Sequence, residues 1–211
     1  MSHVPRGNLR GGAALSAMAV LLSALPAVLL RAEDGGTPAA SAGMVRVDDF
    51  WIDRYEYPNV EGELPRVDVT WREASGLCAA RGLRLCTERE WELACRGARN
   101  FVYGYGPDFE PERCNTPFLG ADGTWVRDRG TAPSGAHDGC GNDNGVRDMI
   151  GNVWEWTDGW YDAGSGWRVV RGGSWFHSAN YARADSRYGR LLDESYSLDL
   201  IGFRCCRSAG P

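Results

Sequence analysis

Lysine is absent from the 211-residue sequence, so all 23 cationic side chains are arginine. This absence excludes Schiff-base chemistry on lysine and the phosphate-binding lysine of a P-loop. The arginines are interleaved with Asp and Glu, and the formal net charge is −5. A nucleic-acid-binding protein needs a clustered basic face, so the sequence predicts no nucleic-acid partner.

Histidine is also scarce, and no C-x-x-C spacing is present, so a zinc site is disfavoured. Only His137 and His177 lie outside the first few residues. Seven cysteines are spread over the rest of the chain: Cys78, Cys86, Cys95, Cys114, Cys140, Cys205 and Cys206. In an exported protein they predict disulfides, and their odd number leaves at least one free thiol.

Residues 1–42 are predicted to be an export signal and linker, followed by one domain over residues 43–211. Two arginines precede the uncharged apolar run 13–30, and small and polar residues follow it. An A-x-A cleavage site at 40–42 favours removal of this segment, which predicts a secreted or periplasmic protein. The run is also just long enough to span a bilayer, so membrane attachment is the alternative if the segment stays uncleaved.

Two helices and several short strands are predicted for the domain. T-x-x-E capping boxes begin at Thr70 and Thr87, and Gly82 and Gly97 stand where the two helices would end. The alternating segment 45–57 predicts a strand or hairpin. Further strands are indicated around NVWEW, WRVVRGGSW and LIGFRCCR, so the predicted fold class is α+β.

The middle of the chain, residues 101–145, is rich in Gly, Pro, Asp and Asn and predicts irregular loops. Strand alternation near the end of the chain places Cys205 and Cys206 on opposite faces. These two cysteines must therefore bond to different partners.

Four motifs together resemble the formylglycine-generating enzyme family, also called the sulfatase-modifying-factor family. They are RLCTEREWELACRG (84–97), DMIGNVWEWTDGW (148–160), RGGSW (171–175) and IGFRCCR (201–207), and the similarity covers Met44 to Arg207. The resemblance implies an irregular, loop-rich α+β domain with a C-type-lectin-like arrangement.

The sequence GNVWEW raises the question of what pairs with Glu155 between two tryptophans. The residues leave two interpretations open, hydrogen bonds from Trp and backbone N–H groups or oxygen ligation of a hard cation. The family resemblance implies the second, with a structural calcium ion bound by Asp148, Gly151, Val153 and Glu155.

Enzymes of the family bind copper(I) through two cysteines placed shortly after the GGS(Y/W) turn, since that ion requires soft thiolates. Here the segment reads GGSWFHSANYARADSR and has no cysteine, so no copper is expected. It is also a few residues shorter than the catalytic form, so His177 or Ala182 is not a simple exchange for cysteine. Leu200 stands where the enzymes commonly have Asn. A branch that holds iron with three histidines is excluded, because only two remain.

The resemblance also implies a Cys78–Cys205 disulfide. Cys95 and Cys114 bracket a loop short enough to close locally, which predicts a second bond. Cys206, on the opposite face, could reach Cys86, and this leaves Cys140 free.

We therefore expect a non-oxidase member of the family with no catalytic residues of the oxidase type, acting as a binding or accessory domain. The alternative is an enzyme with unidentified chemistry. The ligand would be a protein or a glycan, because exposed aromatic loops suit both. The expected binding surface comprises Trp154, Ser174, Phe176, His177 and Tyr181, with Trp167 and the loops around Trp125 and His137 nearby.

Overall fold

The structure is a computed structural model that describes residues 43–127, 129–177 and 179–210. The predicted export signal and linker, residues 1–42, lie outside the described residues. No helix within the described ranges is long and apolar enough to cross a membrane.

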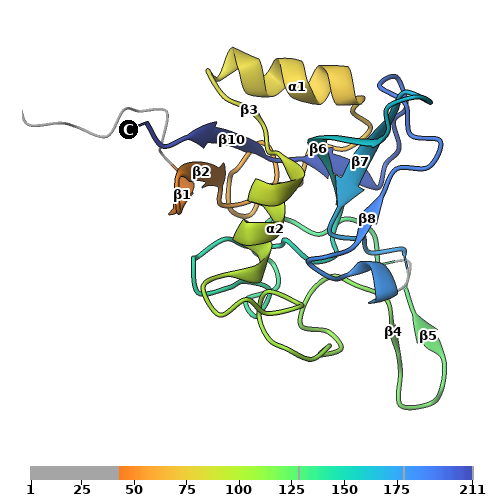
Figure 1. Cartoon of the computed structure of the whole chain (residues 1–211). Helices are drawn as coiled ribbons and strands as arrows, with labels where there is room; N and C mark the ends of the chain where they lie inside the picture. Colours follow the sequence, from red (N-terminus) through yellow and green to blue (C-terminus); the bar gives the residue numbers. More distant parts are fainter. Residues whose placement is uncertain (1–42, 128, 178, 211) are drawn as a thin grey trace, which may run out of the picture. The chain divides into compact units, whose positions relative to one another are not determined.

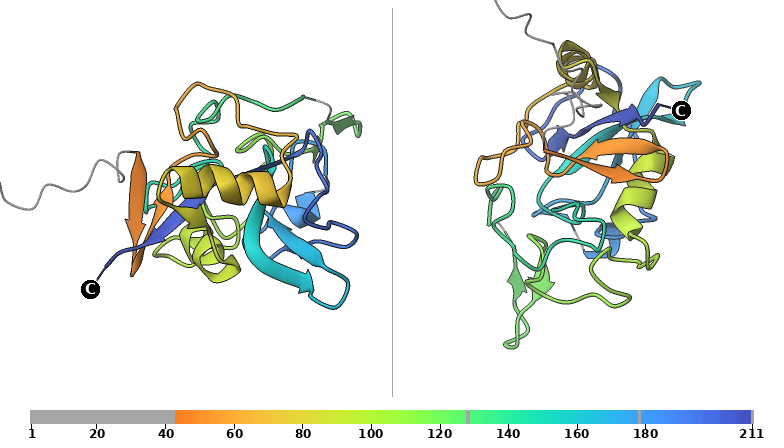
Figure 2. Two further views of the ribbon diagram at one scale, coloured as in Figure 1. Left: turned by 90° about the horizontal axis from the view of Figure 1, so that it is seen from above. Right: turned by 90° about the vertical axis from the view of Figure 1, so that its left-hand side faces the viewer.

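The first sheet joins the two ends of the domain. Four antiparallel strands form it in the order β1 (Met44–Val47), β2 (Phe50–Asp53), β10 (Cys205–Ser208) and β3 (Arg84–Leu85). The predicted hairpin is confirmed, since β1 and β2 pair through the tight turn at Asp48, which has a positive φ. Figures 1 and 2 show β10 beside β2, near the end of α1.

Helices α1 (Trp71–Ala80) and α2 (Glu88–Arg96) begin where the sequence predicted. In both capping boxes the threonine hydroxyl accepts from the glutamate N–H three residues later, and the glutamate carboxylate accepts from the threonine N–H. Gly97 ends α2 with a φ of 66°, a backbone conformation that glycine adopts without strain. The buried face of α2 carries Trp91 and Cys95 into the core.

The second sheet carries most of the motifs that mark the family. Its strands have the order β8 (Arg187–Tyr188), β7 (Trp167–Arg171), β6 (Trp154–Asp162) and β9 (Ile201–Phe203). Strand β9 runs parallel to β6, and the other pairs are antiparallel. The described residues of the segment 101–145 are irregular as predicted, apart from a small hairpin of β4 (Phe118–Leu119) and β5 (Trp125–Val126) that projects from the domain in Figure 1.

The predicted last strand is divided between the two sheets. Residues 201–203 belong to the second sheet as β9, and residues 205–208 belong to the first sheet as β10. Arg204 stands between them with no exposed surface. The chain thus changes sheets at this residue and leaves its guanidinium group in the core.

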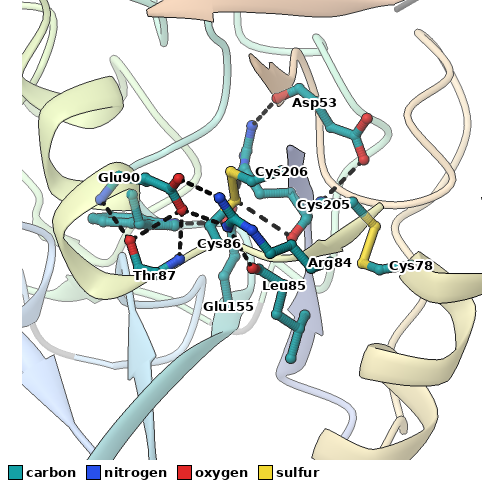
Figure 3. Close-up of a disulfide and its surroundings, with 12 residues drawn as sticks. Asp53, Cys78, Arg84, Leu85, Cys86, Thr87, Glu90, Glu155, Cys205 and Cys206 are labelled. Carbon is teal, nitrogen blue, oxygen red and sulfur yellow. Dashed lines mark hydrogen bonds and ion pairs between the residues drawn. A yellow bond between two sulfur atoms is a disulfide. The ribbon is translucent and has the colours of Figure 1, made fainter. Parts of the chain in front are cut away.

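Two predicted disulfides are present. Cys78 on α1 bonds to Cys205, and Cys86 between β3 and α2 bonds to Cys206. Figure 3 shows the two bonds leaving β10 toward different elements, as the alternation of side chains requires.

The predicted Cys95–Cys114 bond is wrong, and so is the assignment of Cys140 as the free thiol. Cys114 bonds to Cys140, and Cys95 is the free, buried cysteine. The reason is non-local: the Asn142 side-chain amide donates to the carbonyl of Cys95 and to that of the preceding residue, at the end of α2. The 140s loop anchored in this way places Cys140 in the same core cluster as Cys95 and Cys114, and within that cluster Cys140 bonds to Cys114 while Cys95 stays on the buried face of its helix.

Candidate functional site

The carboxylate of Glu155 is neutralised by a buried arginine. Arg204 Nε donates to Glu155 Oε2 and Nη2 donates to Oε1, both at 2.7 Å, and Trp91 Nε1 also donates to Oε2 at 2.7 Å. Neither member of the ion pair exposes more than 1% of its side chain. The remaining guanidinium hydrogens go to backbone carbonyls, those of residues 53, 54 and 147. Such complete pairing is what makes a buried charge tolerable.

Glu155 therefore does not fit the predicted calcium site. Both of its oxygens already accept short hydrogen bonds, and a guanidinium charge beside them would repel a cation. Asp148 Oδ2 also accepts a hydrogen bond from the Gly135 N–H, at 2.7 Å. No cluster of three acidic, His or Cys side chains able to hold a metal occurs among the described residues. Of the two interpretations open from the residues, hydrogen bonding is the one that the geometry supports.

Glu56 is a second buried carboxyl group close to this pair, and the sequence analysis missed it. It is fully buried, accepts from Asn152 Nδ2 at 2.9 Å through Oε1, and contacts the Ser134 hydroxyl at 3.2 Å through Oε2. Burial, with the nearby charge of Asp148, raises the pKa of Glu56 to about 8. Burial likewise raises the pKa of Asp148 to about 6. The only available signal was a single acidic residue in the aromatic segment RYEYPN.

The residues of the expected binding surface lie together around Trp154. The Trp154 ring packs edge-on against His177 and Tyr181, each with ring centroids 5.6 Å away. The Phe176 ring in turn packs edge-on against His177. Phe176 and Tyr181 expose 43% and 37% of their surfaces, whereas Trp154 exposes 2%. The grouping predicted from sequence is therefore present, with Trp154 as its buried base.

A pocket of about 240 Å³ opens beside this cluster, and we call it the aromatic pocket. Aliphatic side chains of β7, β9 and the segment 191–198 form part of its wall. The polar and aromatic part of the wall consists of Trp154, His177, Tyr188, Arg190 and Tyr196. Trp167, Trp125 and His137, which were expected near the surface, do not line it; Trp125 instead lies exposed on the β4–β5 hairpin.

The hydrogen bonds of His177 fix the position of its proton. Trp154 Nε1 lies 3.0 Å from His177 Nδ1, and an indole N–H can only donate. His177 Nδ1 is therefore the acceptor, and the neutral ring carries its proton on Nε2. Burial lowers the pKa of His177, which agrees with a neutral ring.

Ser174 makes hydrogen bonds within its own turn. Its hydroxyl oxygen accepts the backbone N–H groups of Phe176 and His177 and lies 2.9 Å from His177 Nδ1. That ring nitrogen already accepts the hydrogen bond of the Trp154 indole N–H, so His177 is not set up as a base for Ser174. The arrangement gives no support to a serine nucleophile.

The family model for the sulfatase-modifying factor enzyme 1-like domain matches residues 56–209. The chain belongs to this family. The mouse protein "Inactive C-alpha-formylglycine-generating enzyme 2" is 43% identical over 158 residues, which cover 70% of this chain and 50% of the relative. The mouse "Formylglycine-generating enzyme" is 32% identical over 176 residues, which cover 70% of this chain and 45% of the relative. The chain thus spans about half the length of these relatives.

Solved structures share the fold of this chain. PvdO from Pseudomonas aeruginosa superposes with a TM-score of 0.58 at 21% identity, covering 75% of this chain and 80% of that one. The predicted loop-rich α+β fold with its C-type-lectin-like arrangement is therefore confirmed, with strands outweighing the two short helices. The wall of the aromatic pocket contains His177 and none of the described cysteines.

Proposed function

We propose that this chain is an extracytoplasmic, non-oxidase member of the sulfatase-modifying factor family whose aromatic pocket binds a ligand. The observation that carries the proposal is the composition of the pocket wall, which is aromatic and aliphatic around the neutral His177. Copper(I) needs two soft thiolates, and the seven cysteines comprise three disulfides and the buried Cys95. The similarity to relatives named as inactive supports the same conclusion.

Three disulfides support an extracytoplasmic location, because such bonds persist mainly in oxidising compartments. Membrane attachment would depend on the segment 1–42 staying uncleaved. Cell fractionation followed by N-terminal sequencing tests this part of the proposal. Recovery of the chain with its intact N-terminus from the cytoplasmic fraction would contradict it.

The decisive assay for the absence of oxidase activity uses the purified protein with copper(I), oxygen and a peptide that carries the cysteine motif of sulfatases. Mass spectrometry would follow conversion of the peptide cysteine to formylglycine. We expect no conversion above a blank without protein. Conversion above that blank would overturn the proposal and favour the oxidase function.

A further inference from the structure

The aromatic pocket offers positive charge and hydrogen-bond donors but no anionic group. Among the described residues, its wall includes no Asp, Glu, Asn or Gln, and Arg190 is its one charged side chain. Neighbouring arginines are engaged: Arg183 pairs with Asp185, and Arg187 pairs with Glu88. Arg190 is exposed and has no ion pair or hydrogen bond to the described part of the chain. Its guanidinium group is therefore free to bind an anion from outside.

His177 contributes a second donor to the same pocket. Because its Nδ1 accepts from Trp154, its proton is on Nε2, which has no partner among the residues that the structure describes. A neutral imidazole N–H and a guanidinium group in the wall of one pocket suit a carboxylate, which accepts from both kinds of donor. The ring contacts with Trp154 and Tyr181 hold the imidazole in place.

The size and the wall of the pocket restrict the rest of the ligand. A volume of about 240 Å³ is below the roughly 300–1,000 Å³ of pockets that take drug-sized ligands, so it suits one side chain. The wall is formed largely by aromatic and leucine side chains, which favours an apolar group. A sugar is disfavoured as the ligand, because the wall lacks the carboxylate and amide groups that would form hydrogen bonds with neighbouring sugar hydroxyls as acceptors and donors.

We propose that the aromatic pocket binds the C-terminal residue of a peptide or protein, with an apolar side chain inside the pocket and the α-carboxylate on Arg190 and the His177 Nε2–H. The apolar side chain and the carboxylate belong to one residue of this ligand, because the apolar wall and the two donor groups belong to one small pocket. The inference rests on the proposed ligand-binding function and specifies its ligand.

Fluorescence anisotropy with the purified full-length chain tests the proposal. The probe is a labelled Ala-Ala-Ala-Phe peptide with a free C-terminus, and the comparison peptides are its C-terminal amide and the version that ends in Ala. We expect the free acid to bind at least about ten-fold more tightly than the amide, which is typical for a hydrogen-bonded charge. The peptide that ends in Ala should also bind more weakly, because it leaves the pocket unfilled.

Arg190→Gln should remove the preference for the free acid, and Arg89→Gln is the matched control, since Arg89 is an exposed arginine outside the pocket wall. His177→Phe should weaken binding of the free acid more than that of the amide. Equal binding of acid and amide, no saturable binding of either peptide, or an unchanged preference in Arg190→Gln would overturn the proposal. N-acetyl-phenylalanine carries the same side chain and terminal carboxylate, so it should compete with the probe, and failure to compete would overturn the proposal. The formylglycine assay is independent of these results, so failure of the non-oxidase function and failure of the peptide site are distinguishable.

Discussion

Replacement of Glu56 by Gln should make the protein more stable at alkaline pH. The glutamine is nearly isosteric, and both hydrogen bonds survive: its oxygen accepts from Asn152 Nδ2, and its amide donates to the Ser134 hydroxyl. The substitution removes the one feature that burial penalises, an ionisable group that faces Asp148, Glu155 and Arg204 in the core.

The sign follows from where the proton is bound. The pKa of Glu56 is about 8 in the folded protein against an ordinary value of 4.5, so between these pH values the folded state holds a proton that the unfolded state has lost. The free energy of unfolding of the wild type therefore falls as the pH rises from about 4.5 to about 8. At 1.36 kcal/mol per pKa unit, the free energy of unfolding of the wild type falls by about 5 kcal/mol over this pH range.

Urea denaturation from pH 5 to pH 9 measures this effect as the difference between Glu56→Gln and the wild type. The difference should grow with pH and level off above about pH 8, with the variant the more stable protein. Glu63→Gln is the control, because Glu63 is an exposed carboxylate seven residues along the chain. Parallel stability profiles for Glu56→Gln and the wild type would refute the assignment of a protonated Glu56.

Three further predictions concern the core. Glu155→Ala leaves the Arg204 charge buried without its partner and should cost about 3–5 kcal/mol of unfolding free energy. The cost should be the same in the presence of calcium and in the presence of a chelator. A loss of stability seen only in the presence of calcium would restore the metal interpretation. Replacing Cys114 and Cys140 together by Ser should cost about 3.5 kcal/mol in the chain-entropy account of the 26-residue separation, measured by thermal unfolding. A Cys95–Cys114 linked peptide in a non-reducing digest would contradict the pairing. The Cys95 thiol should react with a thiol reagent only after unfolding, because it is buried and burial raises its pKa; rapid labelling of the native protein would be inconsistent with this.

Local chemistry explains why much of the fold was predictable from the sequence. The capping boxes at Thr70 and Thr87 each involve residues three positions apart, so the sequence alone locates the two helix starts. Alternation along a strand likewise separates Cys205 from Cys206 whatever surrounds them. The motifs determined the family, and with it the grouping of Trp154 with the segment after the GGSW turn.

Contacts between distant residues were decided only by the tertiary structure. The partner of Glu155 is Arg204, 49 positions away, and the sequence could not show that the last strand divides between two sheets and turns this arginine inward. The Cys114–Cys140 bond involves a loop that Asn142 anchors to α2, a contact that spacing along the chain does not reveal. The proton position on His177 is set by Trp154, an indole 23 positions away that can only donate. Burial and donor geometry arise when separate segments pack together, so the charge state of the core and the chemistry of the pocket followed from the packing and not from local sequence.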